Sequence, residues 1–104
     1  MKQTILERVN DESLKAVINK MLDADMKVFN AVYHADIDYG WVTAWYKDYK
    51  ISVVVEEHYS VVSVAYKGKE LFEEDDSRYT VRYLFDKAFE RICSLENLRL
   101  KYSV

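Results

Sequence analysis

Three side chains that can ligate a metal ion alternate along residues 34–38: His34, Asp36 and Asp38. Imidazole and carboxylate groups are ligand types for zinc or for a harder cation. A complete site needs further ligands, and the sequence contains no second cluster of histidine or cysteine to supply them. We interpret the segment as a polar connecting loop, and expect no metal and no other cofactor.

Cys93 is the only cysteine in the chain. A catalytic thiol requires a nearby base and electropositive surroundings, and the sequence places neither beside it. No serine-nucleophile motif, P-loop or dinucleotide-binding motif is present, and two glycines leave little backbone to hold phosphates. We therefore expect no catalytic residues and predict that the chain is not an enzyme. A single cysteine excludes an intramolecular disulfide and suits a reducing cytoplasm, the predicted location.

An acidic run, Glu-Leu-Phe-Glu-Glu-Asp-Asp, occupies residues 70–76. The first interpretation is a solvated loop whose last carboxylates favour the N-terminus of the following helix. The alternative is a row of carboxylates that imitates a phosphate backbone and occupies a basic groove on a partner protein. On that interpretation the candidate binding residues are Glu73, Glu74, Asp75 and Asp76.

The elements that would position these groups are organised around Tyr39–Tyr66, which reads as three consecutive antiparallel strands. Residues with β-branched or aromatic side chains dominate this stretch, and polar breaks at residues 47–50 and 57–58 divide it. A two-residue turn at Glu57-His58 pairs Val53 with Val62. A turn around Asp48-Tyr49 pairs Val53 with Ala44 on the other side.

This register sorts the strands into two faces, because successive side chains alternate. The side chains of one face are apolar and are expected to form the hydrophobic core: Val42, Ala44, Tyr46, Ile51, Val53, Val55, Val62 and Val64. The other is aromatic and rich in hydroxyl groups: Trp41, Thr43, Trp45, Ser52, Val54, Glu56, Tyr59, Val61 and Ser63.

The second face supplies the strongest binding signal, because tryptophan and tyrosine are enriched at interface hot spots. Its candidate partner-binding residues are Trp41, Trp45, Glu56 and Tyr59. A helix, the chain terminus or a second copy could instead cover this face. In the last case the chain would be an assembly protein that forms a homodimer through its aromatic sheet face.

A helix precedes the sheet, with Asn10 as the expected N-cap after a short helical turn within residues 4–9. The apolar residues Leu14, Val17, Ile18, Met21 and Leu22 recur at helical spacing. Val28, Phe29 and Val32 continue that stripe and favour helix to about Ala35. The alternative breaks the chain at Asp23–Asp25 and makes residues 27–34 a fourth strand.

A second helix follows the acidic run, capped by Asp76 or Ser77, with Arg78 expected to face solvent. Its apolar stripe is Val81, Leu84, Phe85, Ala88, Phe89 and Ile92. Residues 98–102 alternate and could add a short edge strand. The predicted fold is α+β: a three-stranded antiparallel sheet in an α-β-β-β-α order, with the helices on one face and residues 1–104 in a single domain.

Composition narrows the classes of partner. The 104 residues carry a net charge of −3, whereas binding to a phosphate backbone requires clustered lysine and arginine. We therefore expect a protein partner and no direct contact with nucleic acid. The first residues contain no long apolar run, so neither a signal peptide nor a membrane interaction is expected.

Two resemblances bear on function. The α-β-β-β-α order resembles the double-stranded-RNA-binding domain, but the basic cluster at the start of that family's last helix is replaced here by Glu73-Glu-Asp-Asp-Ser-Arg78. The acidic run, the further carboxylates Asp36, Asp38, Glu56 and Glu57, and the tyrosine content resemble small phage-encoded inhibitors, including anti-CRISPR proteins. That resemblance covers the overall plan. It implies stoichiometric inhibition, without catalysis, of a nuclease or another nucleic-acid-binding protein.

Overall fold

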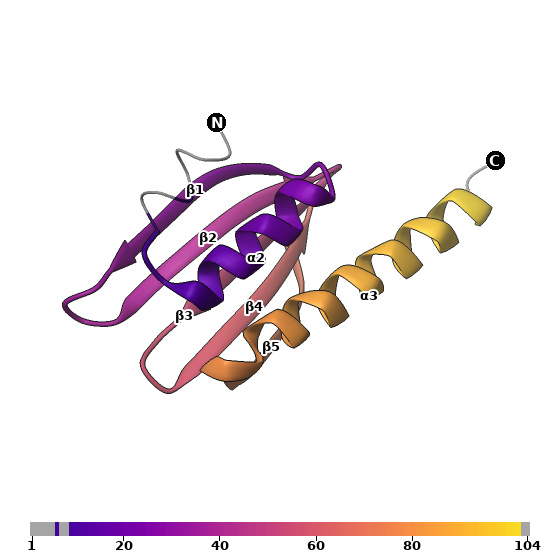
Figure 1. Cartoon of the computed structure of the whole chain (residues 1–104). Coiled ribbons are helices and arrows are strands. Elements are labelled where there is room, and N and C mark those ends of the chain that lie inside the picture. The colour runs from indigo at the N-terminus through magenta and orange to yellow at the C-terminus, as the bar shows by residue number, and fades with distance from the viewer. Residues whose placement is uncertain (1–5, 7–8, 103–104) are drawn as a thin grey trace.

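The structure is a computed structural model that describes residue 6 and residues 9–102, and it has two layers, a sheet and a pair of helices (Figure 1). Five antiparallel strands pair in chain order: β1 (Lys27–His34), β2 (Tyr39–Tyr46), β3 (Tyr49–Val55), β4 (Tyr59–Tyr66) and β5 (Lys69–Ser77). The helices are α2 (Glu12–Asp23) and α3 (Val81–Tyr102), and the short 3-10 helix η1 (Arg78–Thr80) leads into α3. The helical turn expected within residues 4–9 lies largely outside the described residues.

The predicted α+β class is confirmed, with an antiparallel sheet and two helices. The predicted three-stranded sheet is wrong, because β1 and β5 add one strand at each edge. Both helices pack on the same face, α2 over β1 and β2 and α3 over β4 and β5 (Figure 1). We call the other side of the sheet, which carries Trp41, Trp45 and Tyr59, the open face.

The helix expected to continue to Ala35 ends at Asp23, and the alternative with a fourth strand is the one confirmed. Asp25 adopts a left-handed conformation with a φ of 59°, which stops the helix. Met26 N–H bonds to the carbonyl of Met21 at 2.9 Å and Asp25 N–H to that of Leu22 at 3.1 Å. These two bonds form a Schellman motif, in which an aspartate occupies the position usually taken by glycine.

The acidic run is the edge strand β5, so the expected loop is also wrong. The two-residue turn Lys67-Gly68 has positive φ at both positions, 50° and 84°, as a type I′ hairpin turn requires. This turn folds the run back onto β4, where Glu74 lies opposite Val62. At the edge of the sheet the carboxylates remain in solvent, so their charge does not oppose pairing.

The predicted register is confirmed between β3 and β4, where Val53 pairs with Val62. Between β2 and β3 it is wrong by two residues, since Val53 pairs with Val42 and not with Ala44. The turn at this end is shorter than expected, and Tyr46 pairs directly with Tyr49. A slip of two residues leaves every side chain on its predicted face.

The end of α3 and the start of α2 also differ from prediction. Residues 98–102 continue α3 and do not form an edge strand. Asp11, one residue after the expected Asn10, caps α2 by accepting a hydrogen bond from Leu14 N–H at 2.9 Å. Ser77, one of the two expected caps, accepts from Tyr79 N–H and caps η1.

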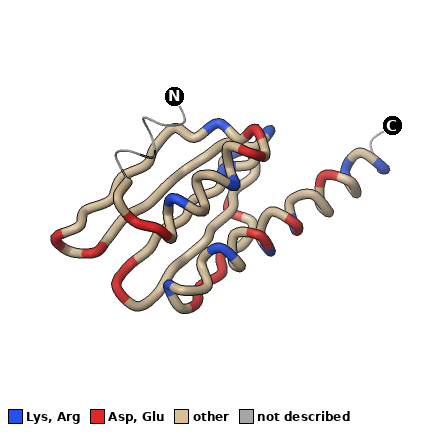
Figure 2. Tube along the Cα trace, viewed as in Figure 1, with Lys and Arg blue, Asp and Glu red and all other residues tan. Residues whose placement is uncertain are grey.

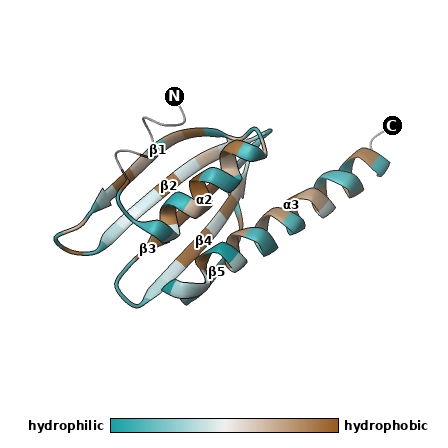
Figure 3. Ribbon diagram, viewed as in Figure 1, coloured by the Kyte–Doolittle hydropathy of each residue, from teal (hydrophilic) through white to brown (hydrophobic). Residues whose placement is uncertain are grey.

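The core lies between the helices and the sheet, and Figure 3 shows hydrophobic residues along α2 and along the central strands. Gly40 on β2 allows α2 to approach closely. A Cβ atom at Gly40 would lie 2.7 Å from the carbonyl oxygen of Val32 and 2.8 Å from Leu14 Cδ1. The fully buried side chains include Leu14, Ile18, Met21, Val42, Ile51, Val53, Val55, Val62, Phe85 and Ile92.

Candidate functional site

The open face has no helix over it among the described residues, so its side chains form a surface (Figure 1). Cross-strand pairing arranges them in rows that run from β1 to β5. One row is Val32, Trp41, Val54, Val61 and Asp75. The next is Asn30, Thr43, Ser52, Ser63 and Glu73. From β2 to β5 these two rows therefore change from Trp41 and Thr43 to valine and serine at β3 and β4 and to carboxylates at β5.

An exposed aromatic pair lies at one end of β1 and β2. The rings of Phe29 and Trp45 stack with their centroids 5.9 Å apart and an interplanar angle of 23°. Phe29 is 49% exposed and Trp45 38% exposed. The pair is a large apolar surface that is in contact with water, which is the property of an anchor residue before it binds.

A second aromatic group lies at the other end of the same two strands. The Trp41 ring is 5.6 Å from that of Tyr39 and 5.8 Å from that of His34, measured between centroids. These contacts leave Trp41 half-buried. The open face thus has two aromatic groups on β1 and β2, separated by the hydroxyl of Thr43.

Tyr59 and Glu56 extend this second group across β3 and β4. The two residues close the β3–β4 turn, with Glu56 N–H bonded to the Tyr59 carbonyl at 2.8 Å. The Glu56 carboxylate also accepts a hydrogen bond from the Tyr59 hydroxyl, and its negative charge raises the pKa of Tyr59. Tyr59 is 45% exposed, so its ring offers an apolar contact and its hydroxyl a polar one.

The four predicted acidic residues do not form one row. Glu73 and Asp75 pair with Ser63 and Val61 and therefore share the open face. Glu74 pairs with Val62 and points to the helix side, as does Asp76. Figure 2 shows further carboxylates at the turns of one end of the sheet. The four carboxylates are therefore divided between the two sides of β5, and Glu73 and Asp75 lie on the open face at the opposite edge of the sheet from β1.

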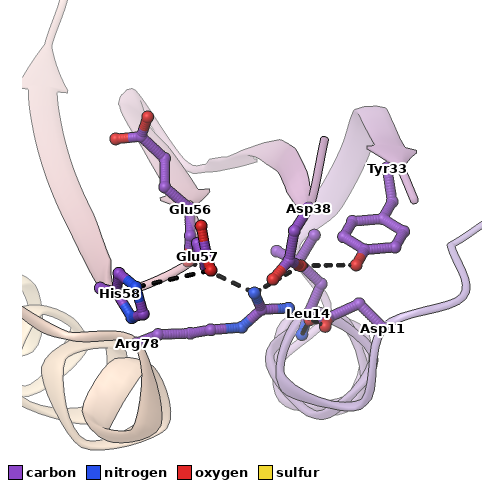
Figure 4. Close-up of polar contacts among 8 residues, drawn as sticks. All are labelled: Asp11, Leu14, Tyr33, Asp38, Glu56, Glu57, His58 and Arg78. Carbon is purple, nitrogen blue, oxygen red and sulfur yellow. Dashed lines mark hydrogen bonds and ion pairs between the residues drawn. The ribbon is translucent and has the colours of Figure 1, made fainter. Parts of the chain in front are cut away.

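The clearest residue that the sequence interpretation missed is Arg78, which is 8% exposed although it was expected to face solvent. Its guanidinium makes ion pairs with Asp11 and with Asp38, the latter at 2.5 Å (Figure 4). It also donates a hydrogen bond to the Glu56 carbonyl at 3.3 Å. Arg78 thereby joins the cap of α2, the β1–β2 turn and the β3–β4 turn.

The charges of this network reinforce one another. Bonding to the Arg78 guanidinium, and then to the Tyr33 hydroxyl at 2.6 Å, lowers the pKa of Asp38. Bonding to Asp38 in turn raises the pKa of Arg78, and the hydrogen bond that the Tyr33 hydroxyl donates to Asp38 raises the pKa of Tyr33. No buried polar side-chain atom of the described residues lacks a hydrogen-bond partner. The role of the network is to hold the turns together.

At the opposite end of the sheet, the buried carboxylate of Glu96 forms a second network of charged side chains. It accepts two hydrogen bonds from Arg99, at 2.9 and 3.3 Å, and its side chain lies 3.7 Å from Lys47 Nζ. Bonding to Arg99, and then to Tyr49, lowers the pKa of Glu96. This group ties α3 to the β2–β3 hairpin.

The remaining candidates are not brought together into a site. Asp38 is bonded within the Arg78 network, and Cys93 is half-buried on α3. In the part of the chain that is described, no three side chains of histidine, cysteine, aspartate or glutamate group as metal ligands. Neither described helix has an apolar stretch long enough to cross a membrane.

Comparison with known proteins gives no family assignment: no family model matches the chain, and no curated protein or solved structure matches it.

Proposed function

We propose that this chain is a small non-catalytic protein-binding module that binds its partner through the open face. The observation that carries the proposal is the exposed stacked pair Phe29–Trp45 on a sheet face that no helix of the described residues covers. Burying such rings in a partner removes a large apolar area from water at little entropic cost. The rows of small residues beside them give a flat surface against which a partner can pack.

Charge indicates what kind of partner would fit. Glu73 and Asp75 lie on the open face at β5, and Glu56 lies beside Tyr59 after the end of β3, whereas Lys27 and Lys50 pair with Trp45. A complementary surface would combine an apolar patch with lysine or arginine side chains. Proteins that bind phosphate backbones carry such basic surfaces. A nuclease or another nucleic-acid-binding protein is therefore the proposed partner class, and inhibition of the phage-encoded, anti-CRISPR-like type is the proposed activity.

The test is the variant Trp45→Ala, with Tyr79→Ala as the matched control. Tyr79 is 85% exposed but lies in η1, away from the open face. Immobilised wild type, Trp45→Ala and Tyr79→Ala are compared for the proteins they retain from a lysate of a candidate host. We expect Trp45→Ala to lose at least about 2 kcal/mol of binding, roughly thirtyfold in affinity, for any specific partner.

Melting curves and a solution mass must accompany this comparison. Truncation of a partly exposed ring should change the free energy of unfolding by only about 1 kcal/mol. Equal retention by wild type and Trp45→Ala would contradict the proposal. A wild-type dimer that Trp45→Ala converts to monomer would instead assign the open face to self-association.

A further inference from the structure

The outer edge of β5 is a second surface with a defined geometry. β5 pairs with β4 on one side and is the last strand of the sheet. The bulge in this pairing lies between Val64 and Ala65, so the register from Phe72 to Ser77 is regular. A regular edge presents unpaired backbone N–H and C=O groups at the spacing that another strand requires. Nearly all side chains of β5 are exposed, which leaves this edge accessible.

A groove of about 300 Å³ runs beside β5 on the helix side. Its lining includes Phe72, Glu74 and Asp76 from β5 and Tyr83, Lys87 and Arg91 from α3. The Arg91 guanidinium lies 4.1 Å from the centre of the Phe72 ring. The groove therefore already holds two cationic side chains, Lys87 and Arg91, against the rings of Tyr83 and Phe72, and it could receive the side chains of an added strand.

The charges of β5 decide what such a strand would be. Glu73 and Asp75 project to the open face, and Glu74 and Asp76 to the helix side, so both faces of an added strand would meet carboxylates. Opposite charges across strands are favourable and like charges are unfavourable. A second copy of β5 would place carboxylate against carboxylate. An extended segment rich in lysine and arginine would instead face carboxylates on both sides, most directly Glu73 and Asp75 on the open face, because Lys87 and Arg91 also line the helix side.

We propose that the edge of β5 binds an extended Lys/Arg-rich segment of the partner protein, which adds to the sheet as a sixth strand. Main-chain hydrogen bonds would supply the alignment, and alternate side chains would pair with the two sets of carboxylates. This inference rests on the proposed protein-binding function and names how part of the partner is held. It also assigns the acidic run a role that a solvated loop could not have.

The test uses a peptide of about nine residues, the length of β5, built from repeats of Lys-Val-Arg. Its control is the same peptide with N-methyl groups on adjacent central residues, which block hydrogen bonding on both edges and preserve the charge. Binding is followed by ¹H–¹⁵N NMR and by amide hydrogen exchange. We expect chemical-shift changes concentrated at residues 72–77, slower exchange there, and at least about tenfold weaker binding of the methylated peptide.

Two protein variants with equal charge change complete the test. The triple variant Glu73→Gln, Glu74→Gln, Asp75→Asn should bind the peptide at least about tenfold more weakly. Asp76 is left unchanged because it accepts a hydrogen bond from Ser77 N–H. The control variant Asp36→Asn, Asp48→Asn, Glu57→Gln removes the same charge from exposed turns.

Equal binding of the two peptides, or equal weakening in the two protein variants, would reduce the effect to general electrostatic attraction and overturn the inference. Such a failure is distinguishable from failure of the proposed function. If the edge does not bind the peptide but Trp45→Ala still loses the partner, only the sixth-strand mode is wrong.

Discussion

Replacing Arg78 with methionine should destabilise the protein strongly, although Arg78 lies outside the hydrophobic core. Its side chain and that of Asp11 are each 10% exposed, so the ion pair between them is largely removed from water. Deleting one partner of such a pair typically costs 3–5 kcal/mol, because the other charge remains buried. Methionine fills a similar volume, which limits any additional effect of a cavity.

The structure places the expected magnitude at the lower end of this range. Asp11 would keep its hydrogen bond from Leu14 N–H at 2.9 Å. Asp38 is 36% exposed and can regain water as a partner. We therefore expect a loss of about 3 kcal/mol in the free energy of unfolding, a large part of the 5–15 kcal/mol typical of a domain. The assay is urea unfolding followed by tryptophan fluorescence.

The second arm of this experiment is a double-mutant cycle with Asp11→Asn, since asparagine still caps a helix but carries no charge. The double variant should be more stable than Arg78→Met alone, with a coupling of at least about 1 kcal/mol. Arg82→Met, at an exposed position on α3, is the control and should change stability by less than about 0.5 kcal/mol. If Arg78→Met behaves like Arg82→Met, the network does not stabilise the fold and the reasoning is refuted.

Two further predictions concern the fold. Gly40→Ala should lower stability by about 1–3 kcal/mol, because the new methyl group would lie 2.7 Å from the Val32 carbonyl oxygen, and an unchanged urea midpoint would contradict the close packing of α2. Acid should destabilise the protein, because the pKa of Asp38 is lowered from its ordinary value of 3.8 and that of Glu96 from 4.5. A carboxyl group with a lowered pKa stabilises the fold fully above its ordinary value, and this contribution is lost as the pH falls through the lowered one. The stability difference between wild type and Asp38→Asn should therefore be constant from pH 7 to about 5 and shrink as the pH falls below about 4; a difference that does not change with pH would contradict the assignment.

The central hairpins could be predicted because their signal is local and strong. β-branched and aromatic residues dominate β3 and β4, and the Glu57-His58 turn fixes the pairing of Val53 with Val62. The error between β2 and β3 arose from the length of one turn. It did not affect the two faces, because the slip was an even number of residues.

β1 was mistaken for helix for an identifiable reason. The strand has an irregularity at Phe29, where pairing passes from Val28 directly to Asn30. The extra residue shifts the alternation, so that Val28 and Ala31 both face the core at a spacing of three. A strand with such a bulge imitates helical periodicity. The same misreading removed Phe29 from the predicted binding face.

β5 and Arg78 could not be predicted because their signals are not local. Carboxylates have low strand propensity, and β5 forms through its hairpin turn and its pairing with β4. Arg78 is buried among partners that are distant in the sequence. Asp38 lies 40 residues earlier in the chain and Asp11 lies 67 residues earlier. Only the packing of α2 against the turns brings Asp11 and Asp38 to it.

The Arg78 network also has a consequence for the open face. Glu56 offers its carbonyl to Arg78 and its carboxylate to Tyr59, so one residue belongs to both the network and the surface. Asp38, fixed by Arg78, directly precedes Tyr39. This end of the open face is therefore held by bonds within the protein, since the turns that present its aromatic residues are fixed in place.

The other end is built differently. Phe29 lies at a bulge in an edge strand, and its ring contacts Trp45 and solvent. A ring in that position can change rotamer without breaking a hydrogen bond, whereas the backbone on either side of Tyr59 is held by the bond from Glu56 N–H to the Tyr59 carbonyl. A partner would thus meet a preorganised surface at the Tyr39–Tyr59 end and an adaptable anchor at the Phe29–Trp45 end. Preorganisation limits the entropy lost on binding, so the fixed end would set orientation while the stacked pair supplies most of the buried apolar area.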